Sequence, residues 1–345
     1  MPQEAGSGFP ALFAGWVQPR LVPEGQGEFG VIRTVLAAMS QRYMDVSLKS
    51  GPGLRVRILE RPGLWMEAAA LEALSADLRR VASRTLAEGG LTYGVFAADR
   101  ARMGQSIITL VTRADGTPVA FNALAVMELD TQPRPTEVLH LGLVMVDPDE
   151  RSRSLSWVLY GLTCFLIFFR RQFRPVWISN VTQVPAVVGM VSGMFSNVWP
   201  VPDGGRRTLT HLILARRIME GHRHVFGVGP EAGFDEDRFV ITNAYTGGSD
   251  DLKKTFDDAP KHRDERFNAF CAQQLDYDRG DDVIQLGQMD LAAIGRYLSR
   301  EVPKGQVPGL LITGGMVALR RLILPLLYWS DSGRQWGVLR PAKDS

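Results

Sequence analysis

Between residues 106 and 200 the chain alternates runs typical of β-strands with runs typical of helices, and this alternation limits the possible folds more than any other feature. Residues 106–112 and 119–127 are apolar runs separated by the turn sequence Asp115-Gly116, which predicts a strand–turn–strand unit. A strand at residues 139–146, a helix at 151–174, a strand at 176–181 and a short helix at 185–194 are expected next. A strand, a helix and a second strand in succession favour parallel pairing. The sequence therefore predicts an α/β (α+β) fold with a mixed central sheet flanked by helices.

The segments on either side of this region are less regular. A strand-like piece at residues 54–59 and a helix at residues 65–87 precede it. A further strand at residues 209–215 is expected to close the sheet. We therefore divide the chain into an N-terminal extension at residues 1–90, a core at 91–215 and a C-terminal extension at 216–345, the last for acceptor binding or membrane contact.

Composition places the chain among ordinary globular proteins. Of its 345 residues, 45% are hydrophobic and 22% are charged, which excludes whole-chain disorder and a collagen-like structure. The 39 basic and 37 acidic residues leave a net charge of +2, so charge gives no reason to expect nucleic acid as a partner. Two cysteines, Cys164 and Cys271, are too few for a disulfide framework, and residues 1–20 lack a signal-peptide pattern, so we expect a cytoplasmic protein.

Two apolar stretches bear on membrane contact. Residues 155–169 carry no charge, but they fall short of the roughly 20 residues that a membrane-spanning helix needs, so a buried helix is expected. Residues 307–329 are long enough but contain two prolines, and the adjacent Arg320 and Arg321 would be costly in mid-bilayer. This second segment fits either core or oligomer packing, or a peripheral helix on the inner membrane face with its arginines towards the head groups.

The most informative segment, residues 144–156, reads as a strand that ends at Pro148, a polar turn and the start of an apolar helix. The turn contains Arg151 and Arg153 together with hydroxyl side chains. Backbone N–H groups in the first turn of a helix have no intrahelical partner and lie at the positive end of the helix dipole, so they can bind phosphate. Arginines add charge-assisted hydrogen bonds. The segment predicts a diphosphate site, with an ordinary solvated β-to-α turn as the alternative.

This segment resembles the acyl-CoA-binding motif of the GNAT superfamily of acyltransferases, in which a strand is followed by Val-x-Pro and then by Arg/Gln-x-x-Gly-x-Gly/Ala at the start of a long helix. Arg151 matches the first position of the second part, whereas Ser154 and Ser156 stand where the family prefers glycine. The resemblance implies a GNAT-like sheet and acyl-CoA as a co-substrate, with no permanently bound cofactor. It also implies the binding residues: Arg151, Ser152, Arg153, Ser154, Leu155 and Ser156 for the diphosphate, and Val144, Met145 and Val146 for the pantetheine arm, where two parallel strands splay apart.

Further positions follow from this resemblance. Thr182 and Gln183 are candidate hydrogen-bond donors to the pantetheine arm, and Met190 stands where many members carry the tyrosine that protonates the departing CoA thiolate. Eleven residues before the first motif arginine, histone-acetylating members place a glutamate that deprotonates the amine, and this position is His140. An imidazole, with a reference pKa of about 6.5, accepts a proton at neutral pH. We predict His140 as general base and Glu137 as the reserve, with a buried structural histidine and a solvated carboxylate as the alternatives.

The other polar clusters are expected to have structural roles. His222 and His224 resemble a metal pair, but no cysteine or helical spacing organises them, so we predict a surface loop and no metal site. The acidic run at residues 276–282 lacks the glutamate that ends a calcium loop and is expected to be a turn. A basic stretch could meet the 3′-phosphate of CoA, anionic lipid or, by default, the acidic residues 231–282; its members are Arg206, Arg207, Arg216, Arg217 and Arg223.

These expectations converge on an N-acyltransferase that moves an acyl group from acyl-CoA to an amine by direct attack. The aromatic helix after the motif and the apolar C-terminus would suit a long acyl chain, since each buried methylene contributes roughly 0.8 kcal/mol. Bacterial ceramide synthases, which acylate the amine of a sphingoid base, are similar in general plan, so a lipid acceptor is the favoured substrate. The alternatives are acetyl transfer to a small amine or a protein lysine, and a degenerate GNAT module that binds acyl-CoA or a membrane.

Overall fold

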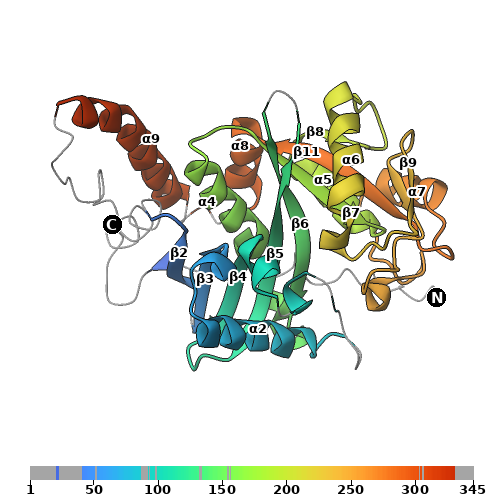
Figure 1. The fold of residues 1–345 in the computed structure, drawn as a ribbon, viewed down its shortest axis with the longest axis horizontal. Helices are drawn as coiled ribbons and strands as arrows, with labels where there is room; N and C mark the ends of the chain where they lie inside the picture. Colours follow the sequence, from blue (N-terminus) through green and yellow to red (C-terminus); the bar gives the residue numbers. More distant parts are fainter. Residues whose placement is uncertain are drawn as a thin grey trace, which may run out of the picture.

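One large mixed β-sheet organises the molecule (Figure 1). The structure, a computed structural model, describes residues 21–22, 41–50, 53–86, 92, 94–97, 99–131, 134–153, 155, 157–302, 304 and 307–330. The strands lie in the order β1 (Leu21–Val22), β2 (Asp45–Ser50), β3 (Leu54–Glu60), β4 (Ser106–Arg113), β5 (Pro118–Leu129), β6 (Thr136–Val146), β7 (Val176–Thr182), β11 (Asp282–Met289), β10 (Val240–Thr242) and β9 (Gly233–Asp235). Beside this path, β8 (Ser196–Trp199) pairs with β11.

Within the described sheet, β6 and β7 are the parallel pair and every other pair is antiparallel. The predicted turn joins β4 to β5, and its Gly116 has a φ of 89°, which favours glycine. β6 reaches β7 through a helical crossover, the connection that parallel strands need. These observations confirm the predicted α/β fold with a mixed sheet flanked by helices.

Successive side chains of each strand point to opposite sides of the sheet, so the buried apolar strands present apolar side chains on both faces. Helices cover both faces. On one face, α2 (Ala68–Ala82) and α6 (Leu209–Gly221) pack around residues such as Phe121 and Val138. On the other, α4 (Thr163–Arg170) and α8 (Leu291–Arg300) pack around Leu139 and Leu141. The remaining helices are α3 (Arg100–Gly104), α5 (Pro185–Met194), α7 (Glu265–Gln274) and α9 (Val307–Ser330), and α9 projects beyond the sheet (Figure 1).

The predicted strand at residues 209–215 is wrong, because these residues begin α6. Thr208 starts the helix with a capping box: its hydroxyl accepts the N–H of His211, and the His211 ring accepts the N–H of Thr208. Leu214, Ala215 and Ile218 are buried at helical spacing. The apolar run resembles a strand when it is considered alone, and the cap at Thr208 was the signal for the helix.

The predicted continuous helix at residues 151–174 is instead three segments. A 3₁₀ turn, η3 (Pro148–Arg153), is followed by a π-helix, η4 (Trp157–Leu162), and then by α4. A buried polar cluster under this segment accompanies the wider π turn. The Thr163 hydroxyl lies 2.5 Å from that of Thr109, and the Asn122 side-chain amide donates to the Leu159 carbonyl at 2.7 Å. Asn122 thus satisfies a backbone carbonyl that a regular helix would pair internally, and Thr109 satisfies a buried hydroxyl.

The sheet draws strands from all three segments into which the sequence was divided. β2 and β3 come from residues 1–90, and β9, β10 and β11 come from residues 216–345. β11 pairs with β7 along the whole of that strand, with Val283 opposite Thr182 and Met289 opposite Val176. Both extensions are therefore part of the sheet that positions the candidate site.

Candidate functional site

The parallel strands β6 and β7 separate partway along their length. Their ladder covers only residues 138–140 and 177–179. Beyond it, β6 continues along β5 to Val146, and β7 continues along β11 to Thr182. Because β6 and β7 stay paired with their outer neighbours but no longer with each other, they diverge. The backbone N–H and C=O groups on their facing edges are then available to another partner. The predicted splay between two parallel strands is therefore present.

Gly142 and Tyr160 shape the point of divergence. Between His140 and Leu143, β6 contains one residue more than the facing part of β5, so β6 bulges there. A Cβ atom at Gly142 would lie 2.1 Å from the carbonyl oxygen of Ala123, so the close approach of the strands requires glycine. The Tyr160 hydroxyl, on the π-helix, donates to the Gly142 carbonyl at 3.2 Å. Burial raises the pKa of Tyr160, so its hydroxyl stays protonated beside the diverging strands.

The turn after β6 is fixed by two arginine–carboxylate pairs. Asp147 accepts the N–H of Asp149 at 3.0 Å and the guanidinium of Arg84 at 3.2 Å. Burial acts to raise the pKa of Asp147, but these two partners lower it below its ordinary value. Arg113, at the end of β4, donates to Glu150 at 2.8 and 2.9 Å. Acidic side chains next to the predicted anion site thus have cationic partners of their own.

The predicted diphosphate residues follow this turn. Arg151, Ser152 and Arg153 belong to η3, and Leu155 is buried. Ser154 and Ser156 lie outside the described residues, as do the side chains of Arg151, Ser152 and Arg153. The backbone of the predicted site therefore sits between the end of β6 and the π-helix, where the family motif would have the start of one long helix.

His140 is buried within the sheet. The residue is 4% exposed, and its ring contacts that of Phe226 at a tilt of 32°, with ring centroids 5.0 Å apart. The Nδ1 atom lies 3.0 Å from the Ser179 hydroxyl oxygen. Burial lowers the pKa of His140 to about 4, so the ring is neutral at pH 7. An imidazole with this pKa is a weak proton acceptor, and the predicted role as general base needs a bound substrate to change its surroundings.

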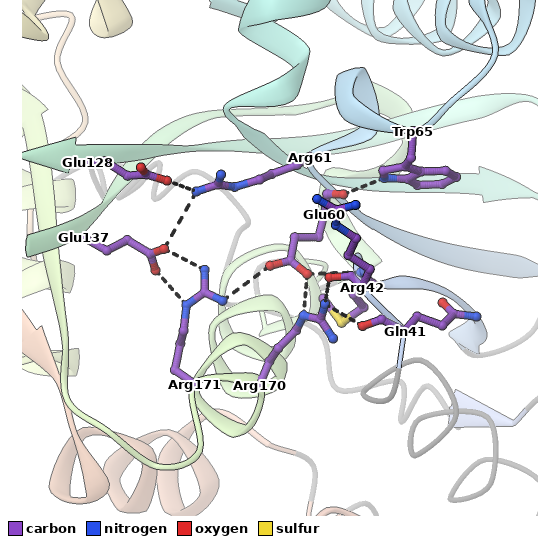
Figure 2. A network of polar contacts seen from close by, with 10 residues as sticks. Gln41, Arg42, Glu60, Arg61, Trp65, Glu128, Glu137, Arg170 and Arg171 are labelled. Atoms are coloured by element: carbon purple, nitrogen blue, oxygen red, sulfur yellow. Dashed lines mark hydrogen bonds and ion pairs between the residues drawn. The ribbon is translucent and has the colours of Figure 1, made fainter. Parts of the chain in front are cut away.

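Glu137, the reserve candidate, belongs to an ion-pair network near the start of β6 (Figure 2). Both of its oxygens accept hydrogen bonds from Arg171, at 2.7 and 2.8 Å. Arg171 also lies 3.6 Å from Glu60, which is 5% exposed and contacts Arg170 as well. Figure 2 shows these groups joined to Arg61, which lies 3.9 Å from Glu137. A carboxylate with both oxygens in such a network is a structural tie between β3, β6 and α4.

Thr182 and Gln183, at the end of β7, have protein partners. The Thr182 hydroxyl accepts the N–H of Val184 at 3.1 Å. The Gln183 amide donates to the Leu252 carbonyl at 3.2 Å, and the Gln183 carbonyl accepts the Tyr277 hydroxyl at 2.6 Å. Within the described residues, the side-chain oxygen of Gln183 is buried without a partner. The free group of Gln183 is therefore an acceptor, whereas we predicted a donor.

A small apolar cavity lies beside the divergence, on the face covered by α4 and α8. Its volume is about 20 Å³, enough for one water molecule. Its walls include Leu141, Tyr160, Met190, Met194, Met289 and Tyr297. Met190 thus shares a cavity with two tyrosine side chains from other elements. In the sequence Tyr160 is one of several aromatic residues of an apolar helix, and Tyr297 follows Arg296 in a helix of mixed polarity, so no pattern links the two.

Two arginines of the basic stretch pair with the acidic residues, as the default interpretation predicted. Arg216 donates to both oxygens of Glu236, at 2.7 and 2.5 Å, and Arg207 lies 3.4 Å from Asp237. The prediction of pairing with the acidic residues is therefore confirmed for these two arginines. Residues 276–282 form the predicted turn leading into β11.

That turn ends in two adjacent carboxyl groups with opposite environments. Asp282 accepts the Tyr245 hydroxyl at 2.9 Å, and burial raises its pKa to about 7. Burial also acts to raise the pKa of Asp281, but its pair with Arg279, at 2.6 Å, helps to lower it. Adjacent aspartates look alike in the sequence, and the difference depends on their partners, a guanidinium for Asp281 and a phenol hydroxyl for Asp282.

In the comparison with known proteins, no family model and no curated protein matches the chain. Among the described residues, no helix is long and apolar enough to cross a membrane. The same part of the chain contains no group of three or more His, Cys, Asp or Glu side chains that could hold a metal ion. The geometry between β6 and β7 is therefore the main basis for assigning a function.

Proposed function

We propose that this chain is an acyl-CoA-dependent N-acyltransferase that binds the pantetheine arm between β6 and β7. The observation that carries the proposal is the divergence of these strands beyond His140 and Ser179. An extended arm with two amide groups can add to an open strand edge through backbone hydrogen bonds, as a peptide strand does. Residues 144–146 would supply those bonds. The η3 turn follows directly on the same strand, so Arg151 and Arg153 belong to the segment that the diphosphate would reach.

The reaction would take place where the strands part. The amine nitrogen attacks the thioester carbonyl, a C–N bond forms, the C–S bond breaks, and the CoA thiolate takes up the proton that the amine gives up. His140 lies on the last rung of the ladder and is neutral at pH 7, as a proton acceptor must be. Tyr160 and Tyr297 share the cavity with Met190, on the face of the sheet opposite the His140 ring, so their hydroxyls are the candidates for a proton donor that reaches the thiolate from that other face.

The favoured substrate is a long-chain acyl-CoA, with a lipid amine such as a sphingoid base as acceptor. A cavity of about 20 Å³ admits no such chain as it stands, so Met190, Met194 and Met289 would have to move. Unbranched thioether side chains repack readily, and this supports a pocket that opens on binding. The same small volume favours acetyl transfer to a small amine or a lysine as the second candidate.

A non-catalytic acyl-CoA-binding module is the third candidate. It is favoured by the buried ring of His140, whose pKa of about 4 makes it a weak base. The site would then hold acyl-CoA without turnover.

An assay of CoA release from the full-length chain separates these candidates. Acyl-CoAs from acetyl to palmitoyl are offered with a panel of amines, and free thiol is followed while binding is measured by calorimetry. Replacing Arg151 and Arg153 by Gln should raise the KM for acyl-CoA about tenfold per arginine, since hydrogen bonds to charged groups contribute about 1.5 kcal/mol or more. The matched control is Arg217→Gln, an exposed arginine paired with Glu220 at 3.1 Å, which should change nothing.

Each outcome selects one candidate. Turnover that increases with chain length supports a lipid acyltransferase, and turnover with acetyl-CoA alone supports the second candidate. Binding without turnover on any amine supports the binding module. Absence of CoA binding by the unaltered chain would contradict all three.

A further inference from the structure

The projecting helix α9 carries most of the exposed large apolar side chains. Of the eleven that the described residues expose, seven lie on α9: Leu311 (58% exposed), Ile312 (54%), Met316 (37%), Leu319 (46%), Leu322 (72%), Leu326 (63%) and Trp329 (88%). After the adjacent Leu311 and Ile312 they follow at steps of three and four residues, which places them along one side of the helix. A contiguous apolar stripe of this kind on a soluble surface marks an interaction site.

The opposite side of α9 is already occupied by the protein. Leu310 is buried, and Val317 packs against the core around α4. A Cβ atom at Gly314 would lie 2.6 Å from Cζ of Phe169, so the helix backbone sits directly on that ring. α9 therefore has two apolar sides, one seated on α4 and one facing outward, and Figure 1 shows it leaving the body of the molecule at an angle.

The charge of this segment indicates which partner fits the outward side. Residues 302–330 contain three basic residues, Lys304, Arg320 and Arg321, and no acidic residue. The charge of +3 in this segment, two units of it within α9, complements anionic head groups above an acyl-chain layer. Trp329 ends the stripe with the amphipathic ring that membrane interfaces favour.

We propose that α9 docks on an anionic lipid membrane, lying in its interface with the outward side inserted. The 24 residues of α9 make a helix about 36 Å long, so the stripe would contact many lipids at once. α9 also packs on Phe169 of α4, and α4 lines the cavity of the candidate site through Cys164. That connection rests on the proposed function, whereas the docking itself does not.

Co-sedimentation of the full-length chain with vesicles tests the docking. Vesicles of phosphatidylcholine are compared with vesicles in which part of it is replaced by phosphatidylglycerol. The test variant is Leu322→Gln with Leu326→Gln, and the matched control is Leu209→Gln with Leu291→Gln, two leucines that are 72% and 67% exposed on α6 and α8. All four are exposed, so folding is retained, which circular dichroism verifies.

The unaltered chain and the control should partition onto the anionic vesicles, and the test variant should partition about 100-fold less, a factor of about ten per leucine. Raising the salt concentration should weaken binding as well. No binding to anionic vesicles would overturn the proposal, and so would a dimer that only the test variant disrupts. CoA release without lipid should be equal in both double variants, so failure of docking and failure of the proposed function are distinguishable.

Discussion

His140 and Ser179 face each other across the last rung of the parallel ladder, with the imidazole Nδ1 3.0 Å from the serine oxygen. Both side chains are buried, at 4% and 0% exposure. Directly beyond this pair, β6 and β7 are no longer hydrogen-bonded to each other. The pair therefore marks where ordinary sheet ends and the candidate site begins, and it can be tested through its protonation.

The free energy of unfolding should depend on pH through His140. The pKa of its ring is about 4 in the folded chain, against an ordinary value of about 6.5, so the unfolded chain binds more protons between these values. Stability should therefore fall as the pH drops from about 6.5 to 4, by about 3 kcal/mol from this group. Urea unfolding at several pH values should show this slope in the unaltered chain and a flatter one in His140→Gln. A ring that titrates near 6.5 by NMR would contradict the assignment.

Asp282→Asn should stabilise the chain at alkaline pH. The pKa of Asp282 is about 7 when folded and near 3.8 when unfolded, so stability is lost as the pH rises through this range. The asparagine keeps an acceptor for Tyr245 and cannot ionise, so unfolding at pH 8 should cost up to about 4 kcal/mol more, with little change at pH 4. Asp281→Asn is the matched control with the opposite sign, because it removes the partner of Arg279. Equal effects of the two substitutions would show that their environments are alike.

Replacing Glu60 by Gln should be strongly destabilising without affecting acyl transfer. Glu60 is 5% exposed and pairs with Arg170 and Arg171, so the substitution leaves buried cations without their carboxylate, at a cost of about 3–5 kcal/mol. Glu137→Gln, at a partly exposed pair, should cost about 1 kcal/mol. Both are measured by urea unfolding, with CoA release as the second readout. Loss of turnover in a folded Glu137→Gln protein would restore that residue as a catalytic candidate.

Gly161→Ala should reduce both stability and acyl transfer. A Cβ atom there would lie 1.9 Å from Cε2 of Tyr297, so the tyrosine that lines the cavity must move, with an expected loss of about 1–3 kcal/mol. Gly193→Ala provides the control, since that helical glycine has no neighbour within 4 Å. It should be neutral or stabilise α5 by about 0.5 kcal/mol. Thermal unfolding and CoA release are measured for both variants. A Gly161→Ala protein as stable and active as Gly193→Ala would contradict the packing role of Gly161.

The sequence predicted the sheet well where local pattern and tertiary structure agree. The turn at Asp115 and Gly116, the motif strand and the apolar crossover all follow from residue periodicity and turn chemistry. The predicted strand at residues 209–215 was wrong, because this apolar run has the composition of a strand but forms α6 after the capping box at Thr208. The sequence also missed the π-helix, whose buried polar partners, Thr109 and Asn122, belong to distant strands.

The candidate site was predictable in part for the same reason. The divergence between β6 and β7 was expected from the resemblance of residues 144–156 to the GNAT motif, and these residues form one continuous segment of the chain. The environment of His140 did not follow, because its burial depends on Phe226, which is far away in the sequence. Nor did the grouping of Tyr160, Met190 and Tyr297, since three separate helical segments bring them together.

The position of β11 between β7 and β10 sets the order in which the chain can complete its fold during translation. β7 is synthesised some 100 residues before the strand that covers its outer edge. At roughly 5–20 residues per second, that edge stays open for about 5–20 seconds on the ribosome. An uncovered strand edge is a template for aggregation, so the nascent chain needs shielding until Met289 has emerged. A chain that stops near residue 215 would keep the edge for its lifetime.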